Sequence, residues 1–130
     1  MKKFWLVLLM MVLCVGCTKV STKSGRSYDF TVVPGKDVPA ELVTQIEKHK
    51  VNPFSLSMTD QGYLYIAVGY GEQETGGYSI RVEYLKERGE DLAIGTSLVG
   101  PKEGQVVKGK KSYPYIVVKT EEIDKNVVYE

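Results

Sequence analysis

The chain has 130 residues, with 17 Lys and Arg against 16 Asp and Glu and a formal net charge of +1. This balance argues against a nucleic-acid-binding protein, because such proteins concentrate basic residues on one face. The part that follows the N-terminal leader and tether, about one hundred residues, is enough for one hydrophobic core and too short for two.

The first 17 residues have the order of a secretory signal. A basic start (Lys2, Lys3) and an uncharged apolar run (residues 4–15) precede Cys17. The string Leu13-Cys14-Val15-Gly16-Cys17 resembles a bacterial lipobox, with a cysteine in place of the usual leucine three positions before the cut. We therefore predict a signal peptide over residues 1–16, a lipid on Cys17, and a location on the extracytoplasmic face of the cell membrane.

The N-terminal segment has two alternative interpretations besides a lipoprotein signal peptide: a simple secretory signal and an uncleaved membrane anchor. The apolar run is short of the roughly 20 residues that a membrane-spanning helix needs, and a polar tether over residues 17–27 follows it at once. Cleavage would remove Cys14 and lipidation would occupy Cys17, so no free thiol would remain for a disulfide, a metal site or a nucleophile.

Residues 28–130 are expected to form a single domain. Alternation over residues 28–33 predicts a first strand, with Tyr28, Phe30 and Val32 on one face. A helix is expected over Pro39–Lys50, because proline suits a first helical turn and the Asn52-Pro53 pair ends the pattern. The apolar stripe of this helix is Leu42, Val43 and Ile46.

The rest of the domain is predicted to be β-structure. Turn signals separate strands expected over residues 54–58, 63–70, 78–84, 92–98 and 113–120, and a final short strand through Ile123, Val127 and Val128. Leu64, Ile66 and Val68 share one face of their strand. Alternation also predicts that four side chains of residues 78–84 point inward: Tyr78, Ile80, Val82 and Tyr84.

Short strands joined by hairpin turns favour antiparallel pairing, and a single early helix must bury its stripe on one sheet face. The predicted class is therefore α+β. We expect a mainly antiparallel β-sheet, folded as a sandwich or half-barrel, with one N-terminal helix packed on it.

Two segments resemble the C-terminal domain of the PrcB family. The first is Thr75-Gly76-Gly77-Tyr78-Ser79, and the second is Tyr113-Pro114-Tyr115, which follows a loop with Pro and Gly. The resemblance covers about residues 62–120. The loop departs from the family pattern where Lys108-Gly109-Lys110-Lys111 approaches the second segment.

The resemblance implies a lipid-anchored, non-enzymatic interaction protein, because the family's named member is a lipoprotein subunit of a surface serine-protease complex. We therefore expect an accessory or stabilising subunit of a surface or secreted protease, with no cofactor and no metal. The partner-binding residues implied are Thr75, Gly76, Gly77, Tyr78, Tyr113, Pro114 and Tyr115.

Other hypotheses stay open. The paired glycines also suit a purely structural turn, and Thr-Gly-Gly-Tyr is similar to the Thr-Thr-Gly-Tyr loop of chagasin-type cysteine-protease inhibitors. A structural envelope lipoprotein is a further alternative. An enzyme is not expected, because His49 is the single histidine and no nucleophile elbow surrounds Ser79 or Ser112. Glu72 and Glu74 are expected to be solvated charges in the glycine-rich loop.

Overall fold

The structure is a computed structural model that describes residues 25–105 and 109–130. The elements in chain order are β1 (Thr31–Val32), the short 3-10 helix η2 (Gly35–Asp37), α2 (Ala40–His49), β2 (Pro53–Asp60), β3 (Tyr63–Tyr70), β4 (Ser79–Arg88), β5 (Asp91–Val99), β6 (Tyr115–Glu121) and β7 (Val127–Tyr129). The predicted signal peptide and the lipid on Cys17 lie outside the described residues. Within the described residues, no helix has the length and apolar character needed to cross a membrane.

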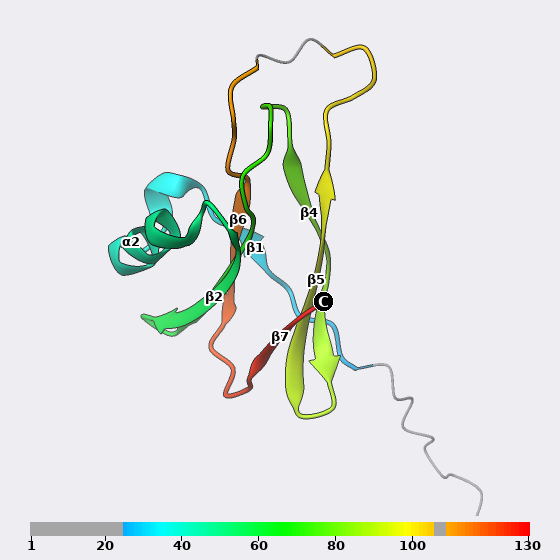
Figure 1. Cartoon of the computed structure of the whole chain (residues 1–130). Coiled ribbons are helices and arrows are strands. Elements are labelled where there is room, and N and C mark those ends of the chain that lie inside the picture. Colours follow the sequence, from blue (N-terminus) through cyan, green and yellow to red (C-terminus); the bar gives the residue numbers. More distant parts are fainter. Residues whose placement is uncertain (1–24, 106–108) are drawn as a thin grey trace, which may run out of the picture.

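Two sheets face each other, and α2 covers the outer side of one of them (Figure 1). The first sheet has the order β1-β6-β3-β2 and is antiparallel throughout. The second has the order β4-β5-β7, in which β7 runs parallel to β5. The predicted α+β class is thus confirmed in its sandwich form, with mainly antiparallel pairing.

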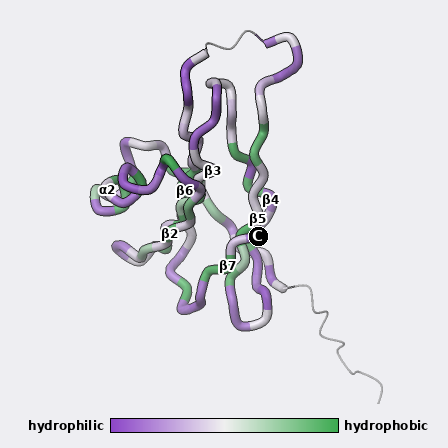
Figure 2. The backbone as a smooth tube through the Cα atoms, viewed as in Figure 1, coloured by the Kyte–Doolittle hydropathy of each residue, from purple (hydrophilic) through white to green (hydrophobic). Residues whose placement is uncertain are grey.

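The central strand β3 supplies both layers of the core. Leu64, Ile66 and Val68 point between the two sheets, as predicted, and are at most 8% exposed. Tyr65 and Ala67 point the other way, toward α2. Hydrophilic residues gather in the loops at the two ends of the sandwich (Figure 2). Because β3 is buried on both faces and paired on both sides, it is the structural centre of the fold.

The helix agrees with its predicted range to within one residue at each end. Leu42 and Ile46 are buried against the first sheet, but Val43 is 36% exposed at the edge of the contact. Residues four apart lie on one helix face, whereas the next residue along is rotated by about 100° at 3.6 residues per turn. The buried stripe of the helix is therefore narrower than predicted, since it contains Leu42 and Ile46 but not Val43.

The segment at residues 28–33 is not one strand, which corrects the prediction. The Tyr28 N–H donates to the Leu85 carbonyl in the second sheet (2.8 Å), whereas Thr31 and Val32 pair with β6 in the first. Tyr28 and Phe30 pack against the core between the sheets, but Val32 is 53% exposed. Because the segment crosses from one sheet to the other, a single alternation cannot hold along it.

The predicted inward orientation of Tyr84 is wrong. Val82 pairs with Thr96 but Tyr84 pairs with Gly95, so β4 has one extra residue at this point. Such a bulge reverses which side chains face the core. Leu85, 2% exposed, points inward after the bulge, and Tyr84 lies on the outer face of the second sheet over Gly95.

Candidate protein-interaction site

The two segments that resemble the PrcB family lie side by side at one end of the sandwich (Figure 1, top). Gln73 and Ser112 exchange backbone hydrogen bonds, with N–H to carbonyl distances of 2.8 and 3.0 Å. The Ser112 hydroxyl also donates to the Thr75 carbonyl at 2.6 Å. Two loops that are far apart in sequence therefore form one connected surface.

Glu72 joins the loops through its carboxylate. Tyr113 donates its hydroxyl to Glu72 Oε1 at 3.1 Å, and Lys111 Nζ lies 3.3 Å from Oε2. The hydrogen bond to Glu72, and next the negative charges of Glu72 and Glu74, raise the pKa of Lys111. Glu72 is exposed, as expected of a solvated charge, but its contacts with Lys111 and Tyr113 across the two segments were not predicted.

The loop that follows β3 begins at Gly71, and its backbone there requires glycine. Gly71 has φ +78°, and a Cβ at this position would lie 2.9 Å from Cδ of Pro53. The next residue, Glu72, donates its N–H to the Val51 carbonyl at 3.0 Å. Tyr70 donates its N–H to the Pro114 carbonyl at 3.1 Å, so the second segment is attached to the same place.

The predicted binding residues fall into two groups around this junction. Tyr113 and Tyr115 lie on the helix side, where Lys50 Nζ is 5.4 Å from the Tyr113 ring centroid and Tyr115 is 6.5 Å from the ring of Phe54. Thr75, Gly76 and Tyr78 are half-buried, Gly77 is exposed, and Pro114 is half-buried between the groups. We call the surface formed by Val51, Glu72, Lys111, Tyr113 and Tyr115 the loop surface.

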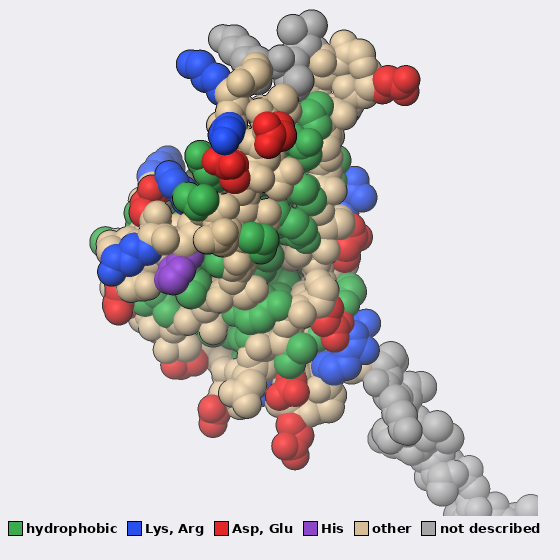
Figure 3. All heavy atoms as spheres, viewed as in Figure 1, with side chains coloured by type: hydrophobic (Ala, Val, Ile, Leu, Met, Phe, Trp, Pro, Cys, Tyr) green, Lys and Arg blue, Asp and Glu red, His purple; other side chains and the backbone are tan. Residues whose placement is uncertain are grey.

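The loop surface combines charge with exposed apolar groups. Val51 is 54% exposed and Tyr115 is 40% exposed, next to the ion pair of Glu72 and Lys111. Figure 3 shows acidic and basic side chains close together at this end of the molecule, beside exposed hydrophobic side chains. Tyrosine is enriched at surfaces where proteins bind one another, whereas Lys and Glu are depleted there, so it is the exposed aromatic groups that fit a binding surface.

Gly77 has φ +85°, a conformation that favours glycine. Gly76 does not have a positive φ, and a Cβ added there would lie in open space. The two glycines are therefore not equivalent: Gly77 is required by the turn, and Gly76 is not.

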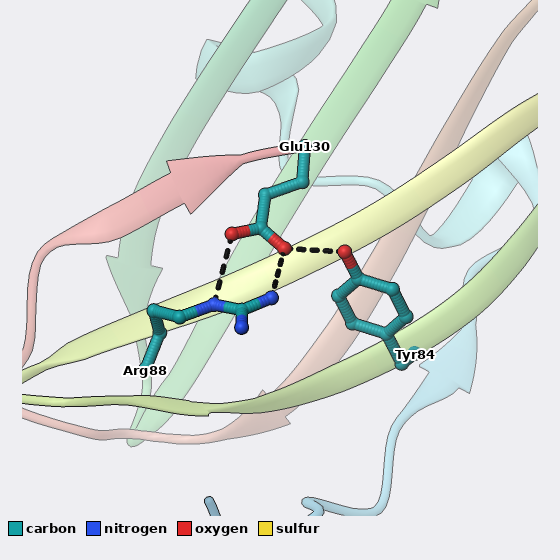
Figure 4. Close-up of polar contacts among 3 residues, drawn as sticks. All are labelled: Tyr84, Arg88 and Glu130. Carbon is teal, nitrogen blue, oxygen red and sulfur yellow. Dashed lines mark hydrogen bonds and ion pairs between the residues drawn. The ribbon is translucent and has the colours of Figure 1, made fainter. Parts of the chain in front are cut away.

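A second polar cluster lies on the outer face of the second sheet (Figure 4). Arg88 Nε donates to Glu130 Oε2 at 3.0 Å, and Tyr84 donates its hydroxyl to the other carboxylate oxygen. Lys86 Nζ lies 4.3 Å from the centroid of the Tyr84 ring. The cluster ties the end of β7 to β4, and no signal in the sequence pointed to it.

Glu130 is expected to make stability depend on pH in acid. The hydrogen bond from Arg88, and next that from Tyr84, hold the pKa of Glu130 below its ordinary value of 4.5. A carboxyl with a lowered folded-state pKa contributes stability above its unfolded pKa and loses it as the pH falls through the folded value. Urea titrations between pH 7 and pH 2 should therefore show a gap between the native chain and Glu130→Gln that closes in acid. The same gap should appear for Arg88→Gln, which removes the largest cause, and a constant gap would contradict this assignment.

His49 is exposed at the end of α2. Among residues 25–105 and 109–130, no three or more His, Cys, Asp or Glu side chains come together in an arrangement that could hold a metal ion.

The fold and the loop surface together define a small α+β sandwich that presents two joined loops at one end. The family model described as PrcB C-terminal matches residues 64–121, which run from β3 through β6 and include both loops. The match confirms the predicted resemblance, and the chain is PrcB-like over this region. No curated protein and no solved structure matches the chain.

Proposed function

We propose that this protein is a lipid-anchored interaction protein on the extracytoplasmic face of the membrane, and that it serves as an accessory or stabilising subunit of a surface or secreted protease. It has no catalytic role of its own in this proposal. The observation that carries the proposal is that the PrcB-like region contains both loops, bonded to each other through Gln73 and Ser112, and with them every residue of the loop surface except Val51.

The construction of the loops supports a role in binding. Loops on a rigid scaffold carry recognition in many proteins, and a partner binds more tightly to a segment that is ordered before binding. Here the backbone of each loop is held by the other, and Glu72 bonds to both Lys111 and Tyr113. Tyrosines are enriched among the residues that dominate binding energy.

The N-terminal sequence supports the proposed location. The lipobox-like string ends at Cys17, and about ten polar residues separate that cysteine from Tyr28. An extended tether of ten residues spans up to about 35 Å. A domain held in this way reaches a partner near the membrane surface while its lipid stays in the bilayer.

Co-purification from native membranes tests the proposal. The full chain is tagged at its C-terminus, extracted in mild detergent, and the recovered proteins are identified by mass spectrometry. A stoichiometric extracytoplasmic protease is the expected result, and its activity should last longer with the chain than without it. Recovery of the chain alone would overturn the proposal, and an inhibited protease would favour the chagasin-like alternative.

The Gly77→Val variant is expected to reduce recovery of the protease by about tenfold, which corresponds to about 1.4 kcal/mol of binding free energy. A β-branched residue cannot adopt φ +85° without strain, so the Thr75–Tyr78 loop must change shape. The matched control is Gly76→Ala, because that position has open space and no positive φ. Both variants are first checked for an intact fold by thermal unfolding. Undiminished recovery with folded Gly77→Val would remove this loop from the binding site.

A further inference from the structure

Strand β5 is paired along its whole length on one side only. All nine residues of Asp91–Val99 lie along β4, with the bulge as the one irregularity. On the other side β7 pairs with Leu92, Ala93 and Ile94 alone. No other strand of residues 25–105 and 109–130 pairs with β5, so the edge from Gly95 to Val99 is free.

The backbone at this free edge is oriented for further pairing. Leu92 donates its N–H to the Asn126 carbonyl at 2.8 Å, and the Ile94 carbonyl accepts from the Glu130 N–H at 2.9 Å. Alternate residues of a strand direct their backbone groups to the same side. Thr96 and Leu98 therefore direct their N–H and C=O groups to the free edge, in line with the pairing that β7 already makes.

A hollow of about 340 Å³ lies beside this edge, between the two sheets. Its walls include Ser55, Val68, Tyr70, Ile94, Thr96 and Tyr129. The hydroxyls of Tyr70 and Thr96 are hydrogen-bonded to each other at 2.7 Å, so these two polar groups already have partners. Glu130 is the acidic residue among the described residues that line the hollow, and its carboxylate is hydrogen-bonded to Arg88 and Tyr84.

We propose that the free edge of β5 and this hollow form a docking site for an extended, β-forming segment of a protein partner. The segment would continue the line of β7, pairing with the backbone of Thr96 and Leu98. Every second side chain would enter the hollow, and its walls, which are uncharged apart from Glu130, fit apolar or aromatic groups there. The side chains between them would face solvent and can be polar.

The occupant is indicated by the chain itself. β7 is an extended strand seated on the same edge of β5, and its Tyr129 side chain forms part of the hollow. The free part of β5, from Gly95 to Val99, offers the same kinds of backbone group to a further strand. Unpaired edges of this kind are sites of strand addition. This site shares no residue with the loop surface, although Phe54 in its wall lies 6.5 Å from the ring of Tyr115. It does not depend on the protease proposed as partner.

A phage-displayed library of random nonapeptides, selected on the full chain, tests the proposal. We expect enriched peptides with apolar residues at every second position, and amide NMR of the bound state should show the Thr96 and Leu98 amides newly protected. A chain extended after Glu130 by the sequence Val-Thr-Val-Thr-Val, which directs its valines to the same side as Tyr129, should fill the edge itself and weaken peptide binding at least tenfold. The matched control is an extension of Gly-Ser-Gly-Ser-Gly, which should leave binding unchanged because it does not favour a strand.

Failure to enrich any peptide would overturn the proposal. So would enriched peptides without the alternating pattern, or peptides that bind both extended chains equally well. Each of these results is independent of whether a protease co-purifies with the chain.

Discussion

Replacing Ile66 with alanine is expected to lower the free energy of unfolding by about 2–5 kcal/mol. Ile66 is 0% exposed and lies on the central strand between the two sheets, with Val118 opposite it on β6. The loss combines the transfer free energy of the deleted methyl and methylene groups with the cost of a cavity that flanking strands cannot close. Because domains of this size are stable by about 5–15 kcal/mol, the change is a large fraction of the total.

Urea denaturation followed by circular dichroism measures this effect. The matched control is Val32→Ala, an aliphatic truncation in the same sheet at a residue that is 53% exposed. Surface changes of this kind alter stability by about 0.5 kcal/mol or less. A loss below about 1 kcal/mol for Ile66→Ala would mean that the two sheets do not form one closed core.

Replacing Gly95 with valine is expected to cost about 1–3 kcal/mol of stability. A Cβ at this position would lie 2.3 Å from the ring of Tyr84, which covers the glycine from the neighbouring strand. The ring would have to move, and its hydrogen bond to Glu130 would be lost with it. The first sheet has the same arrangement, in which the Phe54 ring covers Gly69.

The double variant Gly95→Val/Tyr84→Ala separates the clash from other effects. Removal of the ring should make valine tolerable, so the two changes should be coupled by about 0.5–3 kcal/mol. The coupling is measured as a double-mutant cycle, from the free energies of unfolding of the native chain, the two single variants and the double variant in thermal and urea unfolding. Strictly additive losses would show that the ring of Tyr84 does not rest on Gly95.

Those parts of the fold that depend on neighbouring residues could be predicted from the sequence. The range of β3 and its face with Leu64, Ile66 and Val68 follow from a period of two, and the helix follows from its proline and its stripe. The turn at Asp60-Gln61-Gly62 is also local, since Gln61 and Gly62 both have positive φ. These elements are specified by the residues within them.

Features that depend on distant partners could not be predicted. The bulge at Glu83 shifts the register of β4 against β5, and nothing in residues 78–84 marks the shift. The segment at residues 28–33 divides between two sheets because of contacts with Leu85 and with β6. A short strand such as β7 has too few residues to reveal that it pairs in parallel with β5.

The candidate site shows the same division. The glycines and tyrosines of the two loops could be found from their own motifs, and the requirement for glycine at position 77 follows from local turn chemistry. The role of Glu72 could not, because its partners Lys111 and Tyr113 lie about forty residues away in the chain. A charged residue in a glycine-rich loop gives no local signal of such contacts.

The boundaries of the PrcB-like region have a consequence for where the chain could be divided. The match begins at Leu64, inside β3, yet the core under α2 takes Val33, Val38, Leu42 and Ile46 from before that point. A fragment limited to residues 64–121 would leave Tyr65, Ala67 and Val117 uncovered on that side of the sheet. The region that similarity defines is therefore smaller than the region that forms the core, and α2 and β2 supply side chains that cover the sheet from which the loops extend.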